Sequence, residues 1–204
     1  MAESKSGVKV VLAEPQNSKV SIEKTLLTRR SIRSFDNKSI ARAHIAQLLW
    51  AAQGITSPKG FRTSPSAGAL YPLEIFLVAG FVEQLDPGVF RYDPRNHEMN
   101  KTRNGDARAG LCRAAYGQRC VLHAPISFAI CAIYQRATKK YGERGIRYTH
   151  MEAGHVAQNI CLQAAALGMG TVPIGSFGDD GVKTILNAKA DEEPLYILSA
   201  GFPE

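Results

Sequence analysis

The longest regular hydrophobic pattern runs from residue 145 to residue 167. Its apolar positions are Tyr148, Met151, Ala153, Val156, Ile160, Leu162, Ala165 and Leu167. A helix that is apolar on most sides is buried, and this one would be about 30 Å long at about 1.5 Å per residue. Gly168 and Gly170 end it, because glycine readily adopts a positive φ. The pattern predicts a long buried helix, then a short strand over 171–175 that leads into a glycine turn.

Shorter patterns predict the other elements of a mixed α and β domain. Apolar residues at helical spacing predict helices over 21–30, 39–53, 107–116 and 179–187. Short apolar and β-branched runs predict strands over 73–79, 88–93, 126–133 and 195–200. The run at 126–133 is almost continuously apolar, which indicates a central strand. Residues 136–147 read as a basic connection between that strand and the long helix.

The loop over residues 56–72 mixes Ser, Gly and Pro with Phe61, Leu70 and Tyr71. This mixture is typical of a loop that packs against another surface rather than of a free linker. Residues 1–19 are polar and show no lasting period, so we expect an N-terminal arm followed by one domain over 20–204. No apolar run is long enough to span a bilayer, and the N-terminus lacks a signal-peptide core. A cytoplasmic protein without a membrane segment is therefore expected.

The net charge of +7 has two interpretations. A basic surface suits nucleic acid, but the Lys and Arg residues are spread along the chain and form no run interleaved with aromatic residues. We therefore favour ordinary solvation and binding of small anions, and expect no nucleic-acid partner. The four cysteines have neither C-x-x-C spacing nor partnered histidines. Buried free thiols are favoured over disulfides or a zinc site.

A cluster of hydrogen-bond donors directly follows the first predicted helix: Arg29, Arg30, Ser31 and Arg33. Arginine forks match phosphate oxygens, and serine hydroxyls add donors, so the cluster suits an anion. The alternative is a solvated helix end, where cations also interact favourably with the helix dipole. The residues alone do not separate these two interpretations.

Several familiar motifs are missing from the chain. There is neither a G-x-G-x-x-G nor a G-x-x-x-x-G-K-[ST] sequence, so dinucleotide-fold and P-loop interpretations lack support. His150 and His155 are five residues apart and lie on different sides of the long helix, so no metal site is expected. Glu152, His155 and Asn159 share a helix face; a buried polar network is favoured over one edge of a site.

Six segments in this order resemble the FMN-dependent nitroreductase superfamily, and most closely its SagB-type branch of thiazole/oxazole-forming dehydrogenases. They are RRSIRSF (29–35), LLWAAQGIT (48–56), RTSPSAGALYPLEIFLV (62–78), GVFRYDP (88–94), KYGERGIRYTHMEAGHVAQN (140–159) and LGMGTVPIGSF (167–177). Each segment alone is unspecific, whereas their joint order is specific. Ala69 and Tyr71 stand where typical nitroreductases have Asn and Gln, which shifts the resemblance toward the SagB-type branch.

The resemblance implies an α+β fold in which helices flank a mostly antiparallel central sheet. It also implies an intertwined homodimer with two FMN sites at its interface. The residues implied to bind FMN are Arg29, Arg30, Ser31 and Arg33 at the phosphate and ribityl chain, Pro65, Ser66, Ala67 and Ala69 in a loop reaching the partner's flavin, Gln118, and Pro173, Ile174, Gly175 and Ser176 along the ring. No basic residue follows the last predicted strand, so the arginines near residue 30 must bind the phosphate without the usual C-terminal help.

The activity implied by the resemblance is NAD(P)H-dependent reduction of small electrophilic substrates, by ping-pong hydride transfer through flavin N5. Two alternatives stay open. One is a peptide azoline-to-azole dehydrogenase, because Lys140 and Tyr141 resemble the lysine and tyrosine that those enzymes need. These two are the catalytic candidates, with lysine as general base. The other alternative is a flavin-binding module without turnover.

Overall fold

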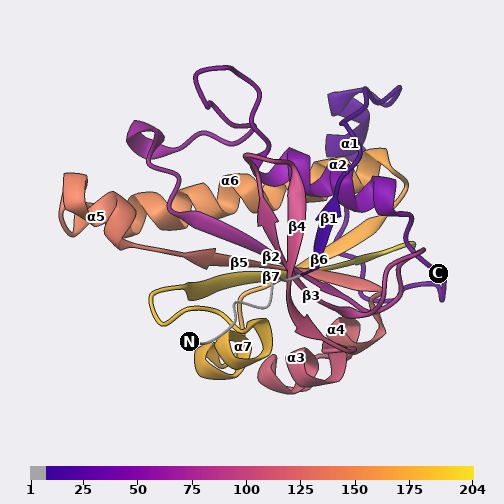
Figure 1. Ribbon diagram of the computed structural model, residues 1–204. Coiled ribbons are helices and arrows are strands. Elements are labelled where there is room, and N and C mark those ends of the chain that lie inside the picture. Colours follow the sequence, from indigo (N-terminus) through magenta and orange to yellow (C-terminus); the bar gives the residue numbers. More distant parts are fainter. Residues whose placement is uncertain (1–7) are drawn as a thin grey trace.

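A seven-stranded sheet forms the centre of the computed structural model, which describes residues 8–204 (Figure 1). Its strands are β1 (Lys9–Val11), β2 (Leu73–Ala79), β3 (Gly88–Asp93), β4 (Glu98–Asn104), β5 (Ile126–Ala132), β6 (Gly170–Ile174) and β7 (Glu193–Gly201). They lie in the order β1-β4-β3-β2-β5-β7-β6, and every neighbouring pair is antiparallel. Strand β5 is buried at all its positions, which confirms the prediction of a central strand.

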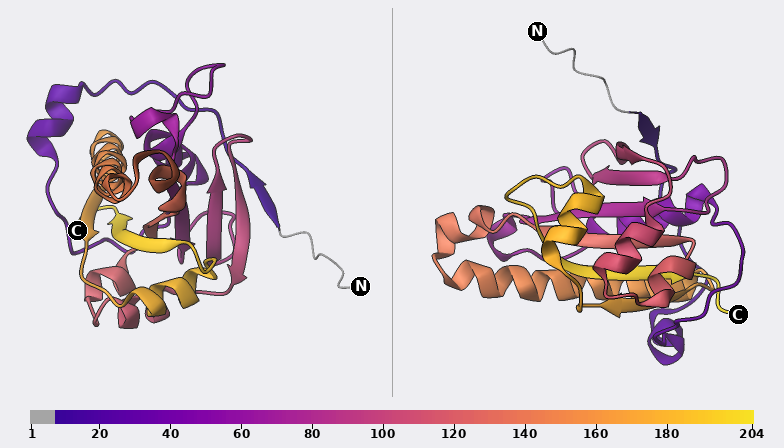
Figure 2. Two further views of the ribbon diagram at one scale, coloured as in Figure 1. Left: turned by 90° about the vertical axis from the view of Figure 1, so that its left-hand side faces the viewer. Right: turned by 90° about the horizontal axis from the view of Figure 1, so that it is seen from below.

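Two layers of helices enclose the sheet, as Figure 2 shows in its left view. Helices α2 (Arg42–Gln53) and α6 (Arg144–Ala166) cover one face, and α3 (Arg108–Ala114), α4 (Arg119–His123) and α7 (Asp179–Leu186) cover the other. The strands alternate between two cores, so that Ile75 and Leu77 meet the first layer and Phe76 and Val78 the second. This arrangement is the predicted α+β fold.

Three shorter elements lie at the periphery of these layers. Helix α1 (Ile22–Thr28) stands outside them and is capped by Ser21, whose hydroxyl accepts the Lys24 amide. A 3-10 turn, η1 (Ala67–Ala69), interrupts the long loop before β2. Helix α5 (Gln135–Tyr141) precedes α6 and lies in the segment that was predicted as a basic connection, where no helix was expected. The prediction was wrong there because Ala137 is the only buried residue of α5, so the helix has almost no apolar stripe.

Helix α6 confirms the predicted long helix and begins at Arg144. The burial of α6 differs from the prediction, because one face of the helix is exposed to solvent; this is called the open face of α6. Val156, Ile160 and Ala164 are buried, whereas Met151 is 55% exposed and His155 is also exposed. An apolar side chain on this open face indicates a surface suited to further packing.

The N-terminal segment differs in part from the predicted arm. Lys9–Val11 pairs with β4 as an edge strand, and the side chains of Val10 and Leu12 are buried. Residues 1–7 of the predicted arm lie outside the described residues. Strand β4 was also not predicted, because its sequence EMNKTRN is mostly polar.

Two further expectations concern the cysteines and the membrane. The four cysteines are free and buried, as predicted. In the part of the chain from residue 8 onward, none of the helices combines the length and the apolar character needed to cross a membrane.

Candidate functional site

The predicted arginine cluster lies beside the C-terminal end of α6. Arg29 and Arg30 line a cavity of about 230 Å³ together with Ala165, Gly168 and Thr171. Within residues 8–204, no carboxylate forms an ion pair with Arg29, Arg30 or Arg33. Cations without an internal counter-charge fit the phosphate of FMN.

The arginines of the cluster differ in what they contact. Arg30 donates from Nη1 to the carbonyls of Leu27 (3.0 Å) and Arg29 (2.8 Å), so it closes the C-terminal end of α1. This is the helix-end alternative, and it holds for Arg30. Arg29 is only partly exposed, and Arg33 is exposed with a free guanidinium among the described residues. Arg29 and Arg33 are therefore the stronger phosphate candidates.

Strand β6 joins this cluster to the predicted glycine turn. The Ile32 amide donates to the Thr171 carbonyl at 2.9 Å, and Ser31 forms a parallel bridge with the same residue. At the other end of β6, Gln118 donates from Nε2 to the Ser176 carbonyl at 2.9 Å. Gly175 and Ser176 are exposed, so their backbone faces open space. The structure thus brings residues 29–33, 118 and 173–176 to one edge of the sheet.

The second predicted group lies around the loop of residues 65–69. Pro65, Gly68 and Ala69 are exposed there, and Gly68 has a φ of +63°. A Cβ atom on Gly68 would lie 2.7 Å from the Tyr141 hydroxyl and 2.9 Å from the Lys140 ammonium. The two catalytic candidates therefore touch the loop that is expected to meet a flavin, and a larger residue at position 68 would have to displace the ends of both side chains.

Aromatic and cationic side chains surround Tyr141. The Lys140 ammonium lies 5.3 Å from the Tyr141 ring, which packs edge-on against Tyr148 at 5.2 Å. Arg144 in turn lies over Tyr148. Such contacts hold a cation near an aromatic surface. They favour a defined position for Lys140 over a freely solvated side chain.

The two groups lie near opposite ends of α6. Tyr148 belongs to the loop group and Ala165 to the arginine group, and a rise of about 1.5 Å per residue separates them by about 25 Å. Figure 1 shows α5 and α1 at the two ends of the same long helix. The structure therefore does not bring all predicted cofactor residues together within one chain.

A buried carboxyl stands behind the loop group. Glu152 on α6 is 3% exposed, and burial raises its pKa to about 7, while a hydrogen bond from Ser66 and the charge of Arg62 act in the opposite direction. Its Oε1 atom has no hydrogen-bond partner within the described residues. This carboxyl can change protonation near neutral pH, directly beneath the loop.

The polar network predicted on α6 does not form as a unit, because no hydrogen bond within the described residues joins Asn159 to Glu152. Asn159 donates from Nδ2 to the Ala51 carbonyl (3.0 Å) and to the Ser64 hydroxyl (2.9 Å), so it ties α6 to the start of the loop. His155 does not take part, because it points to solvent. The prediction was wrong for His155: the buried face of α6 repeats at Glu152, Val156 and Asn159 and excludes it.

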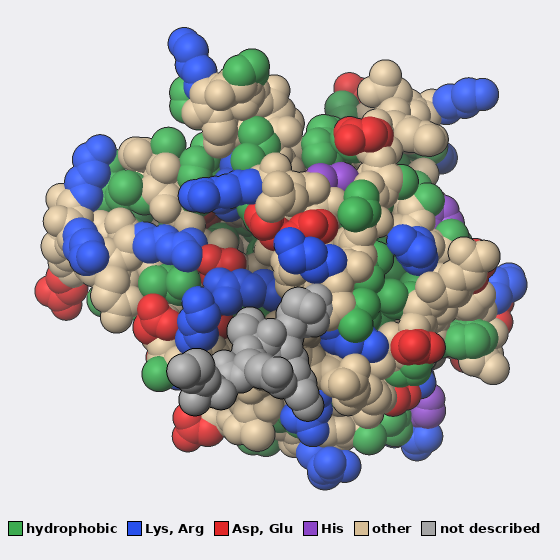
Figure 3. Space-filling model, viewed as in Figure 1, with side chains coloured by type: hydrophobic (Ala, Val, Ile, Leu, Met, Phe, Trp, Pro, Cys, Tyr) green, Lys and Arg blue, Asp and Glu red, His purple; other side chains and the backbone are tan. Residues whose placement is uncertain are grey.

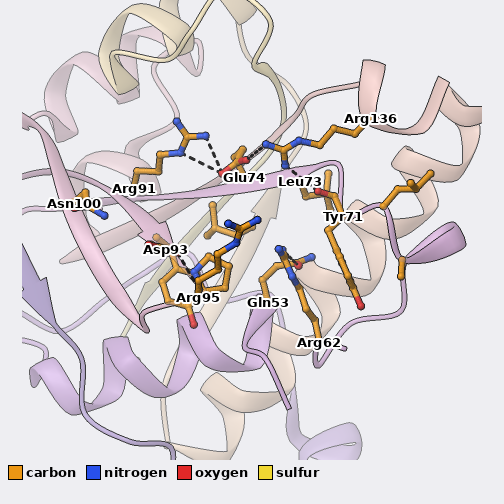
Figure 4. A pocket seen from close by; sticks show the side chains of 15 residues that line it. Gln53, Arg62, Tyr71, Leu73, Glu74, Arg91, Asp93, Arg95, Asn100 and Arg136 are labelled. Carbon is orange, nitrogen blue, oxygen red and sulfur yellow. Dashed lines mark hydrogen bonds and ion pairs between the residues drawn. The ribbon is translucent and has the colours of Figure 1, made fainter. Parts of the chain in front are cut away.

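A charged cavity of about 650 Å³ opens next to the loop group, at the start of β2 and the end of β3. Figure 4 shows Arg91, Glu74 and Arg136 along one side of it, and Arg95, Gln53 and Arg62 along the other. In Figure 3, Lys and Arg side chains mix with Asp and Glu around a hollow left of centre. The sequence reasoning missed this cavity. Its available signal was Glu74, the one charged residue of an otherwise apolar strand.

Comparisons with known proteins agree with this architecture. The model of the Nitroreductase family matches residues 26–202. MJ1384 of Methanocaldococcus jannaschii is 40% identical over 187 residues, covering 92% of this chain and 93% of MJ1384. The chain is also similar to the microcin B17-processing protein McbC of Escherichia coli, at 28% identity over 158 residues, 74% of this chain and 58% of McbC. A nitroreductase-like structure from Ralstonia eutropha JMP134 superposes with a TM-score of 0.85 at 27% identity, covering 100% of this chain and 93% of the other.

Proposed function

This chain belongs to the nitroreductase family and is an oxidoreductase, and we propose that it is an FMN-dependent enzyme that reduces small electrophilic substrates with NAD(P)H. The observation that carries the proposal is the cationic edge of the sheet, where Arg29 and Arg33 have no carboxylate partner among the described residues. The chemistry that FMN supplies when bound is hydride transfer between two reactants.

The chain's own residues would bind and orient the cofactor. Arg29 and Arg33 would hold its phosphate by charge-assisted hydrogen bonds. Gln118 fixes the turn at Ser176 by its 2.9 Å hydrogen bond, which keeps the exposed backbone of Gly175 available to a flat ring. The loop at Gly68 would cover a ring from the other side.

A homodimer would bring the separated halves of the site together. The loop of one chain would meet the arginines of a second chain if two copies packed along the open faces of α6. Helix α1 supports this arrangement, because Ile22, Leu26 and Leu27 are 55%, 55% and 68% exposed while only Thr25 of this helix is buried. Three exposed apolar side chains in one short helix are typical of an interaction surface.

The test of this function is spectroscopic and kinetic. The purified protein should be yellow and release FMN on denaturation. Anaerobic NADH or NADPH should bleach the flavin, and a nitroaromatic or quinone acceptor should restore the colour. A colourless protein that takes up no FMN in a titration contradicts the proposal. If the flavin is bleached but no acceptor is turned over, the protein is a flavin-binding module rather than an enzyme.

A second candidate is oxidation of peptide azolines to azoles. The contact of Lys140 and Tyr141 with the loop at Gly68 favours it, as does the similarity to McbC. Lys140 would accept a proton at Nζ while Tyr141 orients the substrate. The variants Lys140→Ala and Tyr141→Phe distinguish the two candidate functions, once their FMN content has been measured. Selective loss of azoline oxidation supports the azoline dehydrogenase. Unchanged turnover on every substrate that the wild type accepts rejects it.

A further inference from the structure

The charged cavity beside the loop group holds more cations than its carboxylates can neutralise. Its arginines come from four separate places: Arg62 in the loop after α2, Arg91 on β3, Arg95 in the turn after β3, and Arg136 on α5. Its volume of about 650 Å³ lies within the range of small-molecule sites. A cavity lined by so many charged groups suits a polar ligand rather than an apolar one.

Two of these arginines are already paired. Glu74 accepts from Arg136 at 2.6 Å through one oxygen and from Arg91 at 3.0 Å through the other. Arg91 also pairs with the buried Glu192 at 2.7 Å. This chain of ion pairs accounts for Arg91 and Arg136 as structural links between β2, β3 and α5. It leaves the other two arginines unexplained.

Arg62 and Arg95 have no carboxylate partner within the described residues. Arg62 donates to Gln53 at 2.7 Å and packs over the Tyr71 ring at 4.2 Å, and burial lowers its pKa. Asp93 also lines the cavity, but its carboxylate accepts the Arg95 amide and the Asn96 side chain within the turn. The Arg95 guanidinium therefore lacks a counter-ion although an acid lies two residues away.

We propose that this cavity binds a small anion of the carboxylate or phosphate class between Arg62 and Arg95. A guanidinium presents a fixed fork of N–H donors that matches either group. Figure 4 shows both arginines on the same side of the cavity, opposite the Glu74 ion pairs. The anion would supply the negative charge that the two arginines lack, without breaking the existing pairs.

The cavity is also linked to the loop group through Tyr71. Arg136 donates to the Tyr71 carbonyl at 2.9 Å, and the Tyr71 amide donates to the Ser66 hydroxyl at 2.9 Å. Tyr71 has a φ of +46°, so its backbone is held in a conformation that tyrosine rarely adopts. Arg62 packs over the ring of Tyr71, and Tyr71 holds the loop through its hydrogen bond to Ser66. An anion that binds Arg62 would therefore also affect Tyr71. Binding would thereby act on the loop from the cavity, which Ala69 of the loop also lines.

Isothermal titration calorimetry of the purified protein, saturated with FMN, tests the site directly. Inorganic phosphate and succinate are titrated separately, with sodium chloride holding the ionic strength constant. We expect saturable binding of at least one of them, and the comparison shows whether phosphate or carboxylate fits better. No saturable heat with either anion overturns the proposal.

Variants locate the binding. Arg95→Gln removes an exposed side chain of a turn and should fold normally; we expect its affinity to fall about ten- to a hundredfold, as for loss of a charge-assisted contact. Arg113→Gln, an exposed arginine on α3, is the matched control and should bind as the wild type does. Unchanged affinity in Arg95→Gln would place the anion elsewhere and overturn the proposal. Because calorimetry does not require turnover, failure here leaves the proposed oxidoreductase activity unaffected.

Discussion

The Tyr141 hydroxyl lies 2.7 Å from the point at which Gly68 would carry a Cβ atom. This contact joins the end of α5 to the exposed loop of residues 65–69. It means that the loop and the two catalytic candidates form one surface, although about 70 residues separate them in the sequence.

Gly68→Ala should therefore disturb the site beyond its effect on the backbone. Gly68 has a φ of +63°, and an added methyl group would displace Tyr141 and Lys140. Gly60→Ala is the matched control, because its φ is +79° and no atom lies within 4 Å of its Cβ position. Both changes should cost about 1–2 kcal/mol of stability, and only Gly68→Ala should also lower turnover. Equal turnover in the two variants would show that the contact has no functional role.

Arg29→Ala/Arg33→Ala should weaken FMN binding. Charge-assisted hydrogen bonds contribute about 1.5–3 kcal/mol each, which corresponds to roughly ten- to a hundredfold in the dissociation constant per arginine. Fluorescence titration of apo-protein with FMN measures the change, with Arg113→Ala as control. An unchanged dissociation constant in the double variant would mean that the phosphate binds elsewhere.

Glu152→Gln should alter how stability depends on pH. Burial raises the pKa of Glu152 to about 7 from an ordinary 4.5. The folded state therefore binds a proton more tightly than the unfolded state, and the wild type loses stability as pH rises from 4.5 to 7. Glutamine carries no charge, so the Tm of the variant should exceed that of the wild type more at pH 8 than at pH 5, by at least about 3 °C. Glu143→Gln, an exposed control, should show no such trend.

Leu26→Glu/Leu27→Glu should separate the proposed dimer into folded monomers. Both leucines are exposed in one chain, so the change adds charge only to the outer surface of α1. Val11→Glu is the control, because Val11 is 70% exposed on β1 and Figure 2 shows β1 on the opposite side of the molecule from α1. Light scattering with size exclusion measures the mass. A monomeric wild type at micromolar concentration would contradict the dimer itself.

The sequence predicted the elements whose burial follows a simple period. Helix α6 and strand β5 have long apolar patterns, and both were predicted correctly. Helix α5 and strand β4 were missed because their sequences are polar and few of their side chains reach a core. Such elements are stabilised by contacts with neighbouring elements rather than by their own apolar pattern. A search for local periodicity does not detect those contacts.

The site was predictable in its parts but not in its arrangement. The arginine cluster is contiguous in sequence, and the loop stands out by composition. Their distance along α6 depends on tertiary packing alone. The charged cavity was hidden for the same reason, because Arg62, Arg95 and Arg136 are scattered through the chain and meet only in the fold.

Because the loop and the arginines lie at opposite ends of α6, variant subunits could complement each other. If each complete site takes its arginines from one subunit and its loop from the other, two variants with damage in different parts of the site can complement each other. Subunits carrying Arg29→Ala/Arg33→Ala can be mixed with subunits carrying Gly68→Ala, unfolded together and refolded. In the resulting heterodimers, one site would contain all the substitutions and the other site would contain none. The refolded mixture would then be more active than either variant alone, because one site of each heterodimer is intact.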